Sequence, residues 1–357
     1  MKQPLSTNKI FFAPLHGLRG IAALYLVVAH LGQYGLFLLP IPHDAIGKVG
    51  VWIFFVLSAF LLTTHLCHDL ETTSSKVFSL LKYTVHRIFR IYPLFIFSLT
   101  IHLIYRDISR IEFIQHLFLI QGRSELWAIP VEFQYYFIMP VIAMSTLYLP
   151  RRKVILLLAA TLMVALFYGI AQPASVFSNK LNIIPKLAPF LLGSILALLL
   201  YKKKPASPQS QPKFVFFTPT ACLVMLLITT VLFRCIAKNY ISISFAPWLS
   251  IAIGASVMGL IYFALQPTAV STLLGARPLV FLGEISFSVY LLHMFVIRFA
   301  LSLHGLPIVT KAWLSLGLSV LCAIISYWII ERPGIHIGKK ISQKLRTNFP
   351  AAFNVIS

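Results

Sequence analysis

An arginine and two histidines interrupt the apolar segment LHGLRGIAALYLVVAHL at residues 15–31. Arg19 and His30 are eleven residues apart, so on an α-helix they lie about 20° apart around the axis and about 16 Å apart along it. A guanidinium group can stabilise developing negative charge, and a neutral histidine can accept a proton from a hydroxyl group. Gly17 and Gly20 flank the arginine and leave room for a close neighbour. The spacing therefore predicts one helix face that carries chemistry. The alternative is structural: Arg19 extends to the inner membrane surface and His30 caps an outer turn.

A second basic motif, HRIFRIYP, occupies residues 86–93. Arg87 and Arg90 are three residues apart and therefore lie on one side of a helix. Two guanidinium groups placed in this way can hold a phosphate group through paired, charged hydrogen bonds. The alternative is that both arginines only flank a membrane-spanning helix on its cytoplasmic side.

The segment LWAIPVEFQYYFIMP (126–140) places one carboxylate among aromatic residues. Glu132 and Tyr136 are four residues apart and share a helix face. An ionisable side chain inside an apolar helix costs at least a few kcal/mol, so it indicates either a functional site or a buried partner charge. We expect Glu132 to take part in catalysis, with a counter-ion for an arginine as the alternative. His16 and Glu284 are further ionisable residues of the apolar segments.

A polar stripe runs along GEISFSVYLLHMF, residues 283–295. Ser286, Tyr290 and His293 follow one another at positions i, i+4 and i+7, which puts all three on one helix face. The stripe can contact a substrate. Polar stripes also join neighbouring helices within membranes, so a purely structural role is the alternative.

The composition requires these motifs to work in a membrane protein. Hydrophobic residues make up 59% of the 357-residue chain, whereas an ordinary soluble domain has about 45–50%. The four cysteines show no CxxC or metal-ligand spacing, so we expect neither a metal site nor a disulfide framework. The first apolar run lacks the short core and small-residue cleavage pattern of a signal peptide.

Ten apolar segments are long enough, or nearly so, to cross the hydrocarbon core as helices. We therefore predict an all-α, polytopic integral membrane bundle of about ten transmembrane helices, within a range of nine to eleven. The predicted spans are residues 11–32, 46–66, 87–106, 127–148, 154–171, 187–201, 214–234, 247–265, 279–304 and 311–330. A re-entrant segment near residues 111–121 would add to this number.

The chain carries 30 Lys and Arg against 9 Asp and Glu, a net charge of +21. Most of the basic residues fall in alternate loops and in the C-terminal tail, which predicts both termini in the cytoplasm. The excess charge then reflects membrane topology, and we expect no nucleic-acid partner. Residues 1–334 form the predicted membrane domain, which the linker KKKPASPQSQPK (202–213) divides into two lobes. Residues 335–357 form a basic, amphipathic cytoplasmic tail suited to an anionic membrane surface.

Taken together and in this order, the motifs resemble the acyltransferase-3 family of integral membrane acyltransferases. The matching blocks are GLRGIAALYLVVAH, VWIFFVLSAFLL, HRIFRIYP, LWAIPVEFQYYF, GEISFSVYLLH and the closing ERP at 331–333. Ala59 departs from the family, whose members usually show Ser-Gly there, so we expect slightly altered close packing at this position. The chain resembles the stand-alone form, without the SGNH-type hydrolase domain that some members carry.

The resemblance implies transfer of an acyl group, usually acetyl, from acyl-coenzyme A at the cytoplasmic side to a carbohydrate hydroxyl at or beyond the membrane. It implies catalytic roles for Arg19 and His30, and coenzyme A binding by Arg87 and Arg90. Glu132 matches an acidic position of the family with a less certain catalytic role.

The last block of the resemblance gives Ser286, Tyr290 and His293 a weaker role in substrate binding. The implied partners are acyl-CoA, with acetyl-CoA as the expected donor substrate, a carbohydrate acceptor and membrane lipids. No permanently bound cofactor is expected. Our first expectation for the acceptor is lipopolysaccharide O-antigen, and for the location the bacterial cytoplasmic (inner) membrane.

The chemistry of the residues agrees with this reading. A carbohydrate hydroxyl is a poor nucleophile and needs a base, which a buried, neutral His30 can supply. Arg19 can hold the pantetheine arm or stabilise charge on the thioester carbonyl. A transient acyl-His30 intermediate is the alternative to direct transfer, and the sequence does not choose between them.

The rival function is a multi-pass transporter of a sugar or a lipid-linked sugar, in which Arg19, Glu132 and His293 would form a site at the membrane midplane. Many transporters contain two corresponding halves, but no second copy of the Arg19 block follows the linker. The two functions differ in one observable, because only an acyltransferase consumes acyl-CoA and releases a free thiol.

Overall fold

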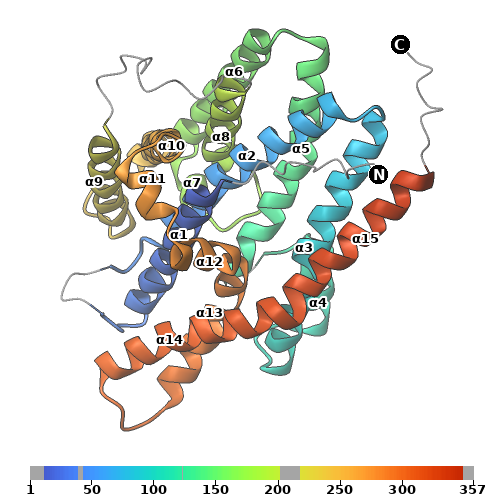
Figure 1. Cartoon of the computed structure of the whole chain (residues 1–357). Helices are drawn as coiled ribbons and strands as arrows, with labels where there is room; N and C mark the ends of the chain where they lie inside the picture. The colour runs from blue at the N-terminus through green and yellow to red at the C-terminus, as the bar shows by residue number, and fades with distance from the viewer. Residues whose placement is uncertain (1–11, 39–42, 123, 202–217, 349–357) are drawn as a thin grey trace.

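The computed structural model describes residues 12–38, 43–122, 124–201 and 218–348, and every regular element in this part of the chain is helical (Figure 1). The longer helices are α1 (Ala13–Gln33), α2 (Gly47–Thr72), α3 (Lys76–Ile104), α5 (Ala128–Tyr148), α6 (Arg151–Ala171), α8 (Leu187–Leu200), α9 (Pro219–Ala237), α10 (Ala246–Ala264), α13 (Ser286–Ser302), α14 (Ile308–Ser326) and α15 (Arg332–Asn348). Shorter elements join them: α4 (Arg110–Leu117), α7 (Pro173–Phe177), α11 (Ala269–Leu274), α12 (Arg277–Glu284), η1 (Ser124–Trp127), η2 (Ile184–Lys186), η3 (Ile243–Phe245) and η4 (Tyr327–Glu331).

Within the described residues, eight helices are long and apolar enough to span a membrane, and the bent pair α12–α13 would make a ninth. The predicted span at 187–201 corresponds to α8. Together with η2, α8 forms an apolar helical segment, Ile184–Leu200, that is shorter than these eight helices. These findings confirm the all-α, polytopic membrane bundle that the sequence predicted. The placement of both termini in the cytoplasm stays a prediction.

Helix α3 begins well before the predicted third span at 87–106. Ser75 caps its first turn, because the serine side chain accepts a hydrogen bond of 3.2 Å from the backbone N–H of Phe78. The helix therefore starts at Lys76, and Arg87 and Arg90 lie inside it rather than at its entrance. The predicted re-entrant segment near 111–121 contains the short helix α4, which opens with a capping box between Ser109 and Glu112.

The C-terminal part of the chain forms a long helical rod. Helix α14, the π-helical segment η4 and helix α15 follow one another without a break, so the helix continues through the predicted domain boundary at 334. Helix α15 lies against α3, where Gly334 and Gly338 allow close contact with Phe89. The predicted linker 202–213 and residues 349–357 of the predicted tail lie outside the described residues.

Helix α1 approaches both α11 and α12 with almost no space between the backbones. A Cβ atom on Gly17 would lie 1.8 Å from the carbonyl oxygen of Leu274, at the end of α11, and one on Gly283 of α12 would lie 1.8 Å from that of His16. Neither position accepts a side chain, because the obstructing atoms belong to the backbone. The glycines beside Arg19 thus bring the chain that precedes α13 onto the first helix.

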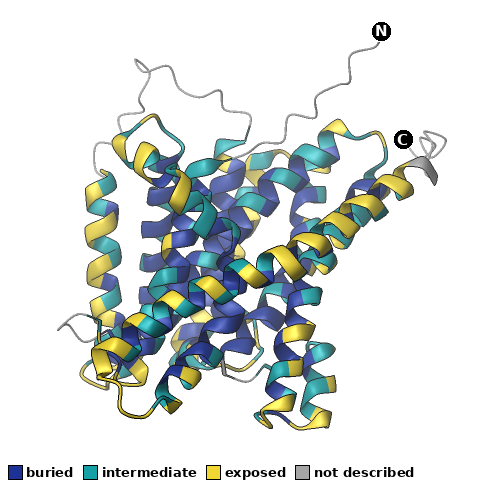
Figure 2. Ribbon diagram, turned by 60° about the horizontal axis from the view of Figure 1, so that its bottom comes forward, coloured by how far each residue is buried: buried dark blue, intermediate teal, exposed yellow. Residues whose placement is uncertain are grey.

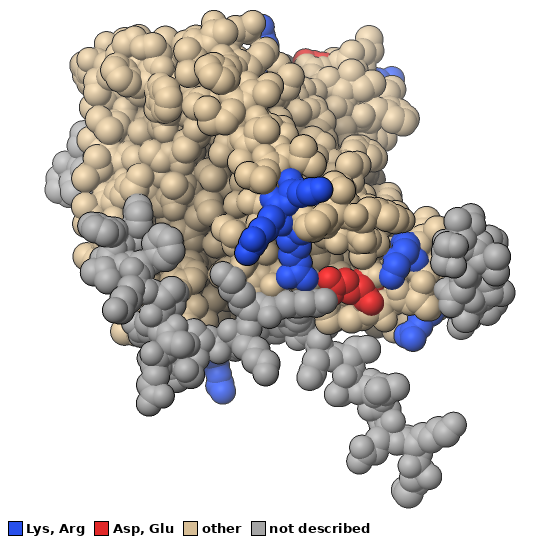
Figure 3. Space-filling view, turned by 90° about the horizontal axis from the view of Figure 1, so that it is seen from above, with Lys and Arg blue, Asp and Glu red and all other residues tan. Residues whose placement is uncertain are grey.

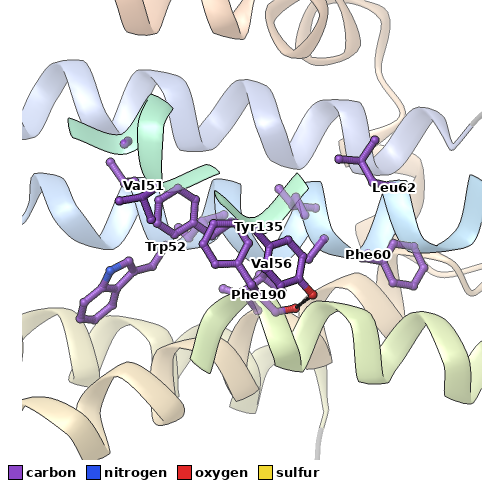
Figure 4. Close-up of a cluster of buried hydrophobic side chains, with 14 of the residues drawn as sticks. Val51, Trp52, Val56, Phe60, Leu62, Tyr135 and Phe190 are labelled. Carbon is purple, nitrogen blue, oxygen red and sulfur yellow. Dashed lines mark hydrogen bonds between the residues drawn. The ribbon is translucent and has the colours of Figure 1, made fainter. Parts of the chain in front are cut away.

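Helix α2 forms the centre of the core, which Figure 4 shows in close-up. Tyr135 stacks on Phe190, and its hydroxyl group is 2.6 Å from the Ser194 Oγ atom. Ala59 is fully buried, and a Cβ atom on Gly193 of α8 would lie 3.0 Å from the Ala59 Cβ. The extra methyl group at position 59 is therefore accommodated by a glycine on the facing helix.

Burial follows the arrangement expected for a bundle in lipid. Figure 2 shows buried residues gathered in the middle and exposed residues on the outer helix faces. Among the exposed side chains are apolar ones such as Leu227 of α9 and Phe167 of α6. Figure 3 looks down on the structure from above the view of Figure 1. On this face, Lys and Arg side chains gather beside acidic side chains, and most of the remaining surface is uncharged.

Candidate active site

Four of the predicted site residues line one cavity in the middle of the bundle. Arg19 comes from α1, Glu132 from α5, and Ser286 and Tyr290 from α13. The other lining residues are Val51, Phe54, Phe55, Ser58, Ala128, Ile129 and Phe287. The cavity offers about 40 Å³ to water-sized groups, which is room for about three water molecules.

The bend between α12 and α13 aims the polar stripe into this cavity. The two helices meet at 72° around Ile285, and the Ser286 hydroxyl donates a hydrogen bond of 2.8 Å to the carbonyl oxygen of Gly283. Because Gly283 also rests on the backbone of His16, the start of α13 has a fixed place beside α1. Glu284, at the end of α12, interacts electrostatically with Tyr327 instead of facing the cavity.

We call the group Arg19, Arg87, Arg90, Glu132 and Glu331 the arginine end of the site. Arg19 interacts electrostatically with Arg90, Glu132 and Glu331. The Nη2 atom of Arg90 lies 3.8 Å from the Glu331 Oε1 atom. Three guanidinium groups thus share two carboxylates, so this end carries excess positive charge.

Glu331 is a site residue that the sequence did not single out beyond its place in the ERP motif. It lies in η4, where a π-helical turn interrupts the rod, and its side chain is fully buried. The Ser288 hydroxyl donates a hydrogen bond of 2.8 Å to its second carboxylate oxygen. Such π-helical turns often occur at functional sites. Here the turn brings a carboxylate against Arg90.

Two guanidinium groups of the arginine end retain unused hydrogen-bonding capacity. The Nε atoms of Arg19 and Arg87 are buried, and neither has a hydrogen-bond partner in the described part of the chain. The Arg19 guanidinium lies 5.9 Å from the ring centroid of Phe54, and that of Arg87 lies 6.0 Å from the ring centroid of Tyr136. These contacts leave N–H groups available to an anionic ligand.

The structure brings together two predicted site residues from distant parts of the chain, a pairing that the sequence did not predict. The Nε2 atom of His293 on α13 is 2.8 Å from the Nδ1 atom of His30 on α1, and the two rings stack with centroids 4.9 Å apart. His293 is fully buried, and its Nδ1 atom lies 2.7 Å from the carbonyl oxygen of Tyr290. We call His30 and His293 the histidine end.

A network of ionisable residues that the sequence did not predict adjoins the histidine end. Glu125 is 5% exposed and interacts electrostatically with both His30 and His293. Its Oε1 atom lies 3.4 Å from His102 Nε2, and His102 Nδ1 lies 3.1 Å from a carboxylate oxygen of Asp107.

The same network also joins neighbouring helices. The Tyr290 hydroxyl donates a hydrogen bond to the Glu125 backbone carbonyl, and Arg298 pairs with Asp107. The carboxylate near the histidines is therefore Glu125, while Glu132 belongs to the arginine end.

The signals for these residues in the sequence were weak. Glu125 precedes the apolar part of its span, and His102 lies near the end of another, so both resemble ordinary flanking residues. Arg19 and His30 share the predicted helix, yet they belong to separate clusters about 16 Å apart along it. The cavity between them reaches from Arg19 to Tyr290, which is one turn short of His293.

The chain resembles known proteins over most of its length. A family model described as an acyltransferase domain matches residues 13–332. A protein named "Putative O-acetyltransferase" from Staphylococcus aureus strain COL is 25% identical over 368 residues, which cover 91% of this chain and 58% of that protein. The O-acetyltransferase OatA of Staphylococcus aureus strain NCTC 8325 is 24% identical over 364 residues, which cover 89% and 56% respectively. This chain therefore spans little more than half the length of these relatives. No solved structure gives a significant match.

Proposed function

The chain belongs to the acyltransferase family whose domain covers residues 13–332, and from this premise we propose that it is a membrane O-acyltransferase that uses acyl-CoA. It transfers the acyl group, with acetyl as the expected case, to a hydroxyl group of a cell-surface carbohydrate. The donor enters from the arginine end, and the acceptor meets it at the histidine end.

The observation that carries this proposal is the separation of the two ends. Arg19, which neighbours Arg90, lies about 16 Å from His30 along α1. In coenzyme A the pantetheine arm joins the phosphate to the sulfur through about thirteen bonds, which at about 1.25 Å each also span about 16 Å when extended. A donor held by its phosphates at Arg87 and Arg90 would therefore present its thioester to His30.

The cavity between the two ends suits the arm itself. Its walls are apolar and aromatic except for Arg19, Ser58, Glu132, Ser286 and Tyr290. The amide and hydroxyl groups of a pantetheine arm can exchange hydrogen bonds with these five side chains. Arg19 and Glu132 then bind and orient the donor at a distance from the reacting carbonyl.

At the histidine end the reaction proceeds by direct transfer. His30 accepts the proton of the carbohydrate hydroxyl while its oxygen attacks the thioester carbon, so the ester C–O bond forms and the C–S bond breaks. The proton then passes from His30 to the leaving thiolate, which yields coenzyme A with a free thiol. Transfer through acyl-His30 is the other route, and it would accumulate a labelled enzyme before acceptor is added.

The test uses membranes from a deletion strain complemented with the full chain. Labelled acetyl-CoA should yield alkali-labile label in the glycan fraction with equal release of thiol, and His30→Ala should abolish both. His304→Ala is the matched control, because His304 is exposed and lies beyond the end of α13. A wild-type chain that consumes no acyl-CoA would refute the function and favour a carrier.

The identity of the acceptor and the cellular location form part of the same proposal. We propose lipopolysaccharide O-antigen as the acceptor and the bacterial inner membrane as the location. Mass spectrometry of surface glycans from the deletion strain should show O-antigen that lacks an acetyl group. Identical acetylation with and without the chain would overturn this acceptor while leaving acyl-CoA consumption as a separate result.

A further inference from the structure

The hydrogen bonds of the histidine end determine which nitrogen of each ring carries a proton. The Nδ1 atom of His293 lies 2.7 Å from the carbonyl oxygen of Tyr290 and 3.2 Å from that of Val289. A carbonyl oxygen only accepts, so Nδ1 of His293 must carry the hydrogen. In a neutral ring, the Nε2 atom of His293 then has a free lone pair and accepts.

The tautomer of His30 follows from that of His293. The two rings meet through His293 Nε2 and His30 Nδ1 at 2.8 Å, so His30 Nδ1 must donate. The reverse direction would require both nitrogens of His293 to be protonated, and a cation on a fully buried side chain is costly. The Nε2 atom of His30 is therefore left with its lone pair, and it has no hydrogen-bond partner among the described residues.

The ring of His30 is also restrained on its face. A Cβ atom on Gly47 would lie 3.1 Å from His30 Nε2 and 3.4 Å from Cε1, so this ring lies close to the start of α2. His293 meets the edge of the same ring, with the two ring planes 26° apart. Two neighbours thus limit the rotation of the imidazole, and one of them also selects its tautomer.

We propose that His293 is a positioning residue, which holds His30 in the tautomer whose Nε2 atom accepts the proton of the carbohydrate hydroxyl. The proposal rests on the proposed acyl transfer for its consequence in catalysis, and on the hydrogen bonds alone for the tautomer. It replaces the substrate-binding role that the sequence suggested for His293. An imidazole without this partner would spend part of its time with Nε2 protonated, and that form cannot accept a proton at Nε2.

The first test compares three variants in the same membranes. His293→Leu keeps the bulk and removes the acceptor, and we expect kcat to fall by about 100-fold with an unchanged KM for acetyl-CoA. His293→Gln retains an acceptor oxygen near the position of Nε2, so its kcat should recover to within about 10-fold of wild type. His304→Leu is the control and should change neither constant. Equal loss in the Leu and Gln variants, or full activity in His293→Leu, would overturn the proposal.

The second test observes the tautomer directly and does not depend on activity. In ¹⁵N-histidine-labelled protein in lipid nanodiscs, the His30 resonances, assigned by their absence from His30→Gln, should show Nδ1 protonated and Nε2 unprotonated. His293→Leu should shift them towards the opposite tautomer or a mixture. An Nε2-protonated His30 in the wild type would refute the positioning role. Failure of the proposed function would instead leave this signature intact while acetyl-CoA is not consumed.

Discussion

The arginine end and the histidine end use buried polar groups in opposite ways. At the arginine end, three guanidinium groups share two carboxylates, and the Nε atoms of Arg19 and Arg87 have no partner among the described residues. At the histidine end, both rings are held by defined hydrogen bonds, and one lone pair remains. Unpaired N–H donors suit the binding of an external anion, whereas rings held by hydrogen bonds with one lone pair left over suit a preset base. We therefore propose that the arginine end provides affinity and the histidine end turnover.

The largest effect should come from removing the base. His30→Ala should lower acetyl transfer by about 1,000-fold or more, because His30 is the proposed acceptor of the hydroxyl proton. The affinity for acetyl-CoA should stay unchanged, since the arginine end is intact. Binding measured by titration and transfer measured by label incorporation would separate the two effects. Lost binding in this variant would remove the division between the two ends.

The next effect concerns affinity. Arg87→Ala combined with Arg90→Ala should weaken acetyl-CoA binding by about 100-fold, because each charged hydrogen bond contributes about 1.5–3 kcal/mol. Wild-type binding should also weaken with rising salt, and the double variant should show less of this dependence. Arg110→Ala, an exposed arginine on α4, is the control. An unchanged affinity in the double variant would show that the phosphates bind elsewhere.

A smaller effect should follow from reducing the space around the His30 ring. Gly47→Ala would place a methyl group 3.1 Å from His30 Nε2, so the ring must move by a few tenths of an ångström. We expect turnover to fall by about 10-fold with an unchanged KM for acetyl-CoA. Gly317→Ala is the matched control, because a Cβ atom there meets nothing within 4 Å. Equal activity of the two variants would show that the ring is not held from this side.

The smallest effect should concern stability outside the site. Asp44, in the loop before α2, pairs with Arg234 at 2.8 Å. Burial alone would raise the pKa of Asp44, but hydrogen bonds from Lys238 and Arg234 hold this pKa below its ordinary value. A carboxylate of this kind stabilises the fold above about pH 4 and progressively less as the pH falls. Asp44→Asn should therefore cost about 1 kcal/mol at neutral pH and lower the unfolding temperature by a few degrees.

The stability loss of Asp44→Asn should depend both on pH and on the presence of Arg234. Thermal unfolding at pH 7 should distinguish Asp44→Asn from wild type, and the difference should shrink as the pH is lowered. Combining Asp44→Asn with Arg234→Met should cost little more than either change alone, since both remove the same interaction. Acetyl transfer should stay close to wild type in all three variants. Additive losses would mean that the pair does not act as a unit.

The sequence predicted which polar residues share a face of one helix, because that depends only on spacing along the helix. Arg19, Glu132, Ser286 and Tyr290 do line one cavity. What spacing could not predict is contact between helices: His30 and His293 are 263 residues apart and meet only because α13 lies against α1.

Two further features explain the residues that were missed. Glu331 reaches Arg90 through a π-helical turn, which has no reliable signal in a single sequence. Glu125 lies in a short 3-10 turn before its span, where charged residues are ordinarily exposed, yet it is buried against His102. In both cases a carboxylate was judged from local sequence, while its role comes from a partner on another helix.

The central claim is that the arginine end binds the phosphates of the donor while the histidine end performs the transfer. The most direct measurement compares acetyl-CoA with S-acetylpantetheine, which has the same thioester arm without phosphates, in wild type and in the variant with Arg87→Ala and Arg90→Ala. We expect the double variant to lose about 100-fold in kcat/KM with acetyl-CoA and almost nothing with S-acetylpantetheine, already a poor donor in wild type. Equal losses with both donors would contradict it, because the two arginines would then act on the reaction or the fold rather than on the phosphates.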